Sequence, residues 1–221
     1  MDQVYRRQRH IYDLTRKYYL LGRDRLVREL GARAGESIVE IGCGTARNLI
    51  QIAKTYPDVR LFGLDASHEM LISAREAVER ADLSERIVLV HGLAEDMKPS
   101  LFGRSEAFDH AIFSYSLSMI PDWRAALDAA CRSTKAGGRI HIADFGDLQD
   151  LWPWAAKALR LWLGLFHVTP RSELLGVLEM SKGVSENRVL HILPGRYAFV
   201  LKAIPNALCG IYPDPVAPRP Q

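Results

Sequence analysis

The stretch Ser37–Leu49, S-I-V-E-I-G-C-G-T-A-R-N-L, decides the fold that this sequence predicts. Residues 38–41 form a short run of mostly β-branched apolar side chains, which is typical of a buried central strand. Gly42 and Gly44 follow at once, and an apolar-periodic segment begins at Thr45, which indicates a helix. A ligand can touch the backbone of such a turn, because glycine has no Cβ and tolerates positive φ. The helix N-terminus adds unpaired N–H groups and a partial positive charge.

The glycine turn distinguishes between kinds of nucleotide site. A dinucleotide fingerprint needs a third glycine or an alanine where Arg47 stands, and no G-K-[ST] sequence follows as in a P-loop. The pattern E-x-G-x-G, from Glu40 through Gly42 and Cys43 to Gly44, resembles the first motif of class I S-adenosylmethionine (SAM)-dependent methyltransferases. The alternative is a glycine turn in some other α/β domain. Cys43 is expected to be a small packing residue rather than a nucleophile.

A second acidic position supports the SAM reading. Residues 60–65 read as a strand that ends in Asp65, about twenty residues past the glycines, where an α/β fold places an acid on a ribose. A carboxylate there can accept hydrogen bonds from both ribose hydroxyls. Ala66 through Met70 begin another helix and complete this part of the predicted cofactor site. The alternative for Asp65 is an exposed turn residue.

Composition sets the class of protein. The 221 residues are 48% hydrophobic and 25% charged, with a net charge of +3, as in a soluble globular domain with additions. Three widely spaced cysteines form neither a zinc pattern nor a disulfide framework, which favours a reducing cytoplasm and predicts no bound metal. Charged and polar residues follow Met1, so no signal peptide is expected.

The remaining strands extend the pattern into an α/β fold. Further strands are expected at 87–90, 108–114, 139–143, 188–193 and 196–203. They predict a Rossmann-like, seven-stranded, mostly parallel sheet with an antiparallel C-terminal edge strand. The predicted organisation is N-terminal lid helices at 1–34, the methyltransferase domain at 35–204 with a Trp-rich helical insertion at about 148–185, and a Pro-rich tail at 205–221.

Ligands in such sheets bind beyond the carboxyl ends of the strands. After the third strand, the backbones of Leu93 and Ala94, followed by Glu95, are candidates to contact adenine, since in the family this turn cradles that base. Leu93 stands where the family often has an acid, which weakens the case for a side-chain bond to the adenine amine. Ser114 ends the fourth strand and joins the predicted cofactor site.

The N-terminal segment reads as a basic helix. Tyr12, Arg16, Tyr19 and Arg23 are spaced to share one helical face. This face predicts a lid over the SAM site, with Tyr19 and Arg23 near the cofactor and Tyr12 near the substrate. Arg23 could pair with the SAM carboxylate in the fork geometry that arginine favours. The same helix could lean on an anionic membrane, and the alternative is ordinary solvated surface.

The segment 151–166 is rich in tryptophan and leucine, interrupted by Lys157 and Arg160. It is too short and too charged for a comfortable membrane span. It is either a buried helix that packs on the sheet or an interfacial helix that faces lipid. Trp154 and Trp162 within it, and Arg171 just after it, are predicted substrate residues.

Four segments carry a closer resemblance: 5–25, 38–48, 113–123 and 142–145. They resemble the N-methyltransferase of bacterial betaine-lipid synthesis. The resemblance implies three successive methylations of diacylglyceryl-homoserine to diacylglyceryl-trimethylhomoserine. The basic N-terminal helix and the helix at 151–166, acting together, predict a cytoplasmic protein attached peripherally to the inner membrane. A complex with the enzyme that makes the acceptor lipid is a further expectation.

Methyl transfer is an in-line displacement at a sulfonium carbon, so positioning and desolvation dominate. The attacking amine must be neutral, and a nearby group should take its proton. Tyr115, Asp144 and His167 are the candidate acceptors, while Tyr12 and Tyr19 could hold the growing ammonium by cation–π contact.

Two rival functions stay open. One is methylation of another apolar molecule, such as a quinone precursor. The other is a SAM-binding module without catalysis. Nucleic-acid methylation is disfavoured, because no N/D-P-P-Y/F motif follows the fourth strand and the basic residues concentrate near the N-terminus.

Overall fold

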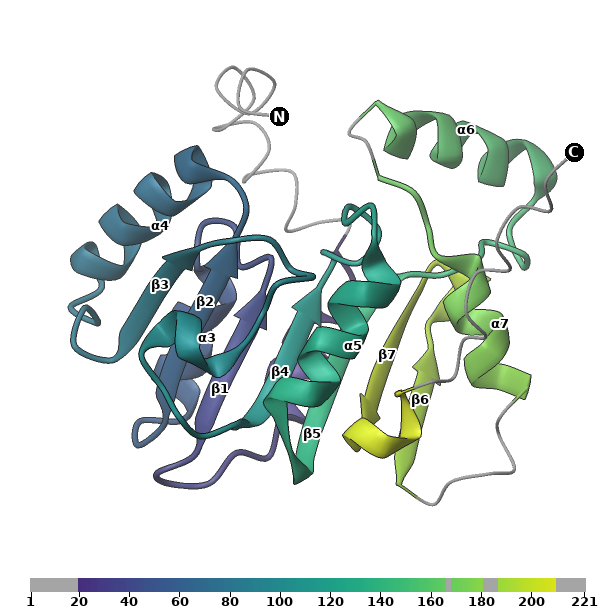
Figure 1. Ribbon diagram of the computed structural model, residues 1–221. Coiled ribbons are helices and arrows are strands. Elements are labelled where there is room, and N and C mark those ends of the chain that lie inside the picture. The colour runs from purple at the N-terminus through teal and green to yellow at the C-terminus, as the bar shows by residue number, and fades with distance from the viewer. Residues whose placement is uncertain (1–19, 166–167, 181–186, 210–221) are drawn as a thin grey trace, which may run out of the picture.

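The computed structural model describes residues 20–165, 168–180 and 187–209. A seven-stranded sheet forms its centre, in the order β3-β2-β1-β4-β5-β7-β6 (Figure 1). The strands are β1 (Ser37–Ile41), β2 (Arg60–Asp65), β3 (Ile87–His91), β4 (Phe108–Ser114), β5 (Thr134–Phe145), β6 (Arg188–Ile192) and β7 (Ala198–Ala203). Strands β3, β2, β1, β4 and β5 pair in parallel, and β7 runs antiparallel to both β5 and β6. The predicted mostly parallel sheet is confirmed, and β7 lies between β5 and the edge strand β6.

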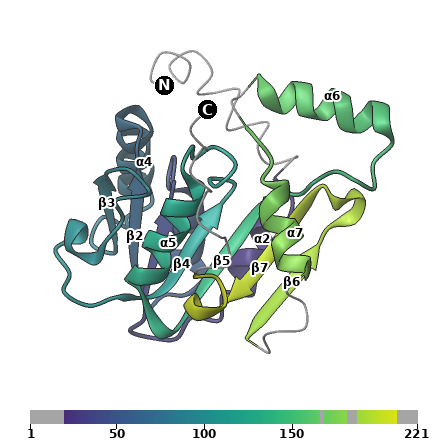
Figure 2. The same ribbon diagram turned by 45° about the vertical axis from the view of Figure 1, so that its right-hand side comes forward.

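Helices cover both faces of the sheet (Figures 1 and 2). They are α2 (Arg23–Arg28), α3 (Arg47–Thr55), α4 (His68–Arg80), α5 (Trp123–Ser133), α6 (Pro153–Gly164) and α7 (Ser172–Met180). Short 3-10 turns lie at Pro99–Phe102, Pro194–Arg196 and Pro205–Ala207. One buried cluster lies under α2, α3 and α4, and a second lies under α5 and α7. Because strand residues alternate between faces, Ile38 joins the first cluster and Val39 the second.

Helix α6 belongs to the predicted insertion and lies beyond the carboxyl ends of the strands (Figures 1 and 2). Pro153 occupies its first turn, where a missing N–H is harmless. Its buried residues, Ala156 and Leu163, face the protein. In the described part of the chain, no helix is long and apolar enough to cross a membrane.

Two histidines are buried where β4 and β5 pair. His110 Nδ1 lies 3.0 Å from His141 Nε2, and His110 Nε2 lies 3.0 Å from a Glu36 carboxylate oxygen. Burial lowers the pKa of both imidazoles, and Lys202 lowers them further. Glu36 opposes this effect at His110 without reversing it. Both rings are therefore neutral in the folded protein near pH 7.

We expect this pair to make the protein sensitive to acid. Histidines in the unfolded chain take up protons near pH 6.5, while the buried rings resist protonation. The free energy of unfolding should therefore be flat above about pH 6.5 and fall as the pH drops below it. Urea denaturation across that range measures the slope, and His141→Phe should flatten it. An unchanged slope in that variant would contradict the assignment.

Candidate functional site

A pocket opens at the carboxyl ends of β1 and β4, at the edge where the sequence predicts a ligand. It unites six of the predicted cofactor residues: Arg23, Glu40, Gly42, Cys43, Gly44 and Ser114. Four further residues, which the sequence reasoning did not assign to the site, complete the lining: Leu20, Thr45, Arg47 and Asn48. The pocket thus combines the glycine turn with the segment that leads into α2.

The glycine turn has no room for a side chain at Gly42. Gly42 has φ +76°, and a Cβ at this position would lie 2.5 Å from Ser116 Cβ. The backbone N–H groups of Gly42 and Cys43 both donate to Leu64 O, at 2.8 and 3.0 Å. The turn is therefore tied to the end of β2, and its bare backbone faces the pocket.

Asp65 holds the same turn from the other side. One carboxylate oxygen accepts a hydrogen bond from Gly44 N at 2.7 Å, and the other accepts one from Ser67 N at 2.8 Å. Asp65 is only half-buried, so part of its carboxylate faces solvent. The structure thus puts the predicted ribose acid directly beside the glycines.

A chain of polar side chains crosses the pocket wall. Arg23 donates to Asn48 Oδ1 through Nε at 3.2 Å and through Nη2 at 2.8 Å. Asn48 Nδ2 in turn donates to a Glu40 carboxylate oxygen at 2.5 Å. Glu40 and Asn48 are buried, whereas Arg23 is half-buried. The Asn48 side chain therefore bridges the Arg23 guanidinium on α2 and the Glu40 carboxylate on β1.

The charges of the pocket match the groups of SAM. The cofactor carries a carboxylate, an ammonium, a sulfonium and a ribose. Arg23 and Arg47 in the lining offer cations, and Glu40 offers an anion. Asp65 lies outside the lining but adds a second carboxylate beside it, bonded to Gly44 N. Among the described residues, none lies within hydrogen-bond distance of the buried Ser114 hydroxyl, which leaves a polar atom available at the pocket. The residues present fit the cofactor that the sequence predicts.

Cys43 is a packing residue within this site. Its side chain is buried, and its sulfur would lie 2.8 Å from a Cβ built on Gly63. Burial raises the pKa of the thiol well above its ordinary value, and the nearby carboxylates of Asp65 and Glu40 raise it further. The thiolate that a nucleophile needs is therefore suppressed.

Tyr115 lies under the segment that leads into α2. Its phenol donates a hydrogen bond to Leu21 O, and its ring packs edge-on against Phe145 at 4.7 Å. Burial raises the pKa of the phenol well above its ordinary value, and the nearby Asp144 carboxylate raises it further. A donating, neutral phenol is poorly suited to accept a proton. We therefore interpret Tyr115 as a positioning residue that fastens the Arg23 segment over the pocket.

Tyr115→Phe should loosen this segment without emptying the core. Loss of one hydrogen bond is expected to weaken SAM affinity by about 1 kcal/mol, because Leu20 and Arg23 would no longer be held in place. The measurement is the KM for SAM alongside kcat. A general base would instead lower kcat steeply with little change in KM, and that outcome would contradict a positioning role.

Asp144 is buried at the end of β5. Its carboxylate accepts hydrogen bonds from Ser118 N at 3.0 Å and from Phe145 N at 2.8 Å. Burial raises its pKa to about 6, although these bonds oppose the shift. With 1% of its surface exposed, Asp144 fixes the loop after β4 rather than meeting an acceptor directly.

The other predicted cofactor residues lie at the same edge of the sheet but outside the pocket lining. Met70 is buried on α4, where its N–H donates to Ser67 Oγ at 3.3 Å. Leu93 is 49% exposed after β3, with Ala94 buried and Glu95 half-buried behind it, and Ala66 is exposed after β2. Their contacts with a cofactor stay predictions.

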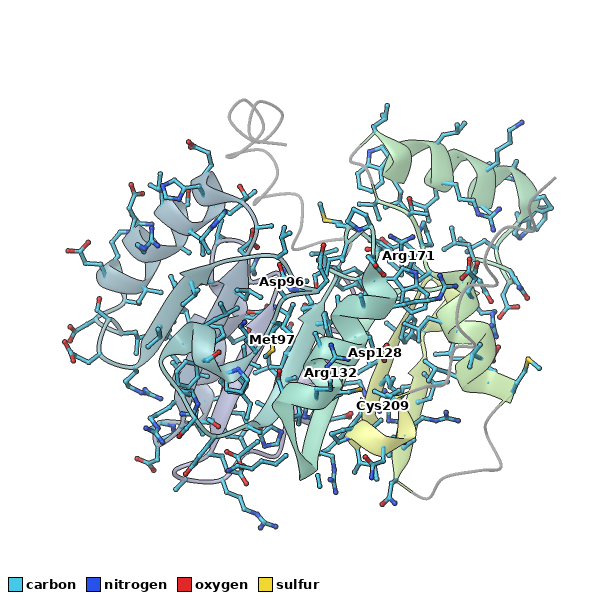
Figure 3. All side chains as sticks on the ribbon, in the orientation of Figure 1. Asp96, Met97, Asp128, Arg132, Arg171 and Cys209 are labelled. Atoms are coloured by element: carbon cyan, nitrogen blue, oxygen red, sulfur yellow. The ribbon has the colours of Figure 1, made fainter. Side chains whose placement is uncertain are left out.

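The predicted substrate residues separate into different environments. Trp154 is exposed on α6, whereas Trp162 packs against the core cluster under α2, α3 and α4. Arg171 donates to Leu117 O at 3.1 Å and to Ile120 O at 2.6 Å, and it lies between the top of α5 and α7 (Figure 3). It therefore holds the loop after β4. Three further predicted residues lie outside the described part of the chain: Tyr12, Tyr19 and His167.

In residues 20–165, 168–180 and 187–209, no group of three or more His, Cys, Asp or Glu side chains is arranged to bind a metal ion.

Comparison with known families and proteins gives a consistent result. Residues 38–138 match the family described as "Methyltransferase domain". The O-methyltransferase resE of Aspergillus sclerotiorum is 31% identical over 153 residues, which cover 67% of this chain and 55% of that protein. The demethylmenaquinone methyltransferase of Corynebacterium glutamicum is 31% identical over 166 residues, 67% of this chain and 66% of that protein. The chain thus spans about half to two thirds of the length of these curated relatives.

Solved structures share the fold. The SAM-dependent methyltransferase SibL in its apo form superposes with a TM-score of 0.64 at 18% identity, covering 91% of this chain and 58% of that one. A SAM-dependent methyltransferase from Aquifex aeolicus superposes with a TM-score of 0.61 at 16% identity, covering 86% and 92%. The predicted Rossmann-like methyltransferase fold is confirmed.

Proposed function

We propose that this chain, which carries a class I SAM-dependent methyltransferase domain, methylates the headgroup of a lipid acceptor. One observation carries the proposal: the pocket lies at the carboxyl edge of the sheet, and α6, with exposed tryptophans at its N-terminal end, lies beyond the same edge. An acceptor with a polar headgroup and apolar chains would need both features. Only its headgroup would have to reach the pocket.

The protein's part in the reaction is to bind and orient. Bound SAM supplies an electrophilic methyl group on a sulfonium. In this proposal Arg23, which donates a hydrogen bond to Asn48, would bind the SAM carboxylate, and Asp65, which bonds to Gly44 N, would bind the ribose. Tyr115 fastens the segment that forms one wall, so water is kept from that side. Positioning of this kind accounts for most of the catalysis that methyl transfer requires.

For the acceptor, we propose the amine of diacylglyceryl-homoserine, methylated three times. Its support is the resemblance of segments 5–25, 38–48, 113–123 and 142–145 to the betaine-lipid N-methyltransferase. A quinone-type acceptor is the second candidate, favoured by the likeness to demethylmenaquinone methyltransferases. Both acceptors are apolar molecules with one polar reactive end, so the exposed apolar surface suits either. A SAM-binding module without catalysis is the third.

Incubation with SAM and each acceptor in mixed micelles, followed by mass spectrometry, separates these functions. The proposed activity should give mono-, di- and trimethylated lipid in succession. A single methylation of a demethylquinone would instead support the second candidate. SAM binding without turnover on either acceptor would favour the non-catalytic module. Asp65→Ala serves as the control that lacks the cofactor site.

A further inference from the structure

Helix α6 presents an apolar face to solvent. Trp154, Leu161 and Leu165 are 71%, 67% and 71% exposed, and their spacing of seven and four residues puts them on one side of the helix. Trp152, the residue before the helix, is 74% exposed. Large apolar side chains grouped in this way mark an interaction site rather than ordinary surface.

The opposite side of the same helix packs against the protein. Ala156 and Leu163 are buried, and Leu159 and Trp162 pack against the core cluster under α2, α3 and α4. The exposed face is therefore separate from the face by which α6 packs on the described part of the domain. The helix is held in this orientation by Arg160, whose guanidinium donates to Asp147 O at 2.9 Å.

The charges on α6 favour one kind of partner. The helix carries Lys157 and Arg160 and no acidic residue, and the nearest carboxylate before it in the sequence is Asp150. Lys157 is exposed beside the tryptophans and leucines. Tryptophan is enriched at membrane–water interfaces, and lysine can keep its stem in apolar surroundings while its charge reaches anionic headgroups.

The size of the face argues against a stable protein partner. Four large side chains are exposed here, whereas a stable protein–protein interface uses about 20–30 residues a side. A helix that inserts shallowly into a bilayer does not need an interface of that size, because its apolar side chains contact the acyl chains directly.

We propose that this face, Trp152, Trp154, Leu161 and Leu165, is a membrane-docking surface that inserts into the interface of an anionic bilayer. Docking through α6 turns the carboxyl edge of the sheet, and with it the SAM pocket, toward the membrane (Figure 1). The inference deepens the proposed function and relies on it only for the lipid nature of the acceptor. Binding through one short face should be weak and reversible.

Vesicle sedimentation of the full chain tests the surface apart from the activity. The vesicles contain phosphatidylcholine with or without phosphatidylglycerol, and neither SAM nor acceptor lipid is added. Binding should rise with the share of phosphatidylglycerol and fall with salt. Trp152→Ser with Trp154→Ser should lower the partition coefficient about tenfold or more, as should Leu161→Ser with Leu165→Ser.

The matched control changes exposed apolar residues elsewhere. Val88→Thr with Val189→Thr alters the two edge strands, β3 and β6, where these side chains are 43% and 49% exposed. This variant should bind vesicles like the parent. SAM affinity should be unchanged in all three double variants, which shows that each one is folded.

Three results would overturn the proposal. The parent could fail to bind anionic vesicles, or the two α6 variants could bind as well as the parent. A concentration-dependent dimer that dissociates in the α6 variants would assign the face to a second copy of the chain. Vesicle binding without methylation of any lipid would refute the proposed function and leave the docking surface standing.

Discussion

Asp65→Ala should weaken SAM binding by about 2 kcal/mol or more, roughly thirtyfold, as expected for the loss of charge-assisted hydrogen bonds. The variant removes the predicted partner of the ribose. It also removes the acceptor for Gly44 N and Ser67 N, so the glycine turn keeps only its backbone bonds to Leu64 O at the end of β2. Isothermal titration calorimetry with SAM measures the change.

Two controls separate binding from folding. Asp58 lies just before the start of β2 and is exposed, at the opposite end of the strand from Asp65. Asp58→Ala should bind SAM like the parent. Asp65→Asn should fall between the two, because an amide keeps one acceptor and loses the charge. Unchanged SAM affinity in a folded Asp65→Ala variant would remove Asp65 from the cofactor site.

The sheet could be predicted because its signals are local. Each buried strand is a short apolar run. Residues 38–41 are followed directly by Gly42, and residues 60–65 end in the acid Asp65. Strand β5 starts earlier than predicted, at Thr134 rather than 139, and pairs with Phe108 before a register irregularity. The order of β6 and β7 depends on tertiary pairing, which no local pattern records.

The site was predictable where the motif itself touches the ligand. Glu40, Gly42 and Gly44 line the pocket as expected. Asn48 lies in the stretch Ser37–Leu49, four residues after the glycine motif. Its role depends on a hydrogen bond from Arg23, which lies 25 residues away in the sequence. Tyr115 contacts Leu21 across 94 residues, and this contact changes its interpretation from proton acceptor to positioning residue. Such long-range contacts cannot be derived from spacing or periodicity.

The attachment of the insertion at about 148–185 to the rest of the domain was also not predicted from the sequence. Arg196, which has φ +50°, donates to both carboxylate oxygens of Asp147, at 2.7 and 2.6 Å. It also donates to both oxygens of Glu179 on α7, at 3.0 and 2.7 Å. One guanidinium thereby joins the turn before β7 to the loop before α6 and to α7. These three residues are far apart in the sequence and follow no motif.

Arg196→Met should therefore destabilise the protein by about 3 kcal/mol. The side chains of Asp147 and Glu179 are only 5% and 27% exposed, so the variant would remove the Arg196 guanidinium from one buried and one half-buried carboxylate. Burial by itself raises the pKa of Asp147, but the Arg196 guanidinium and the backbone N–H of Gln149 together hold that pKa below its ordinary value. Methionine keeps much of the side-chain volume, so the loss reports the charge rather than a cavity.

Arg124→Met is the matched control, since Arg124 also pairs with a glutamate on α7, Glu173. That pair is 41% and 65% exposed, so its loss should change the free energy of unfolding by less than about 1 kcal/mol. Urea denaturation of both variants at pH 7 measures the difference. If Arg196→Met lowers stability no more than Arg124→Met does, the ion-pair cluster does not hold the insertion. If the cluster does hold the insertion, the same variant should also bind anionic vesicles more weakly, because the loop before α6 would lose one of its attachments to the domain.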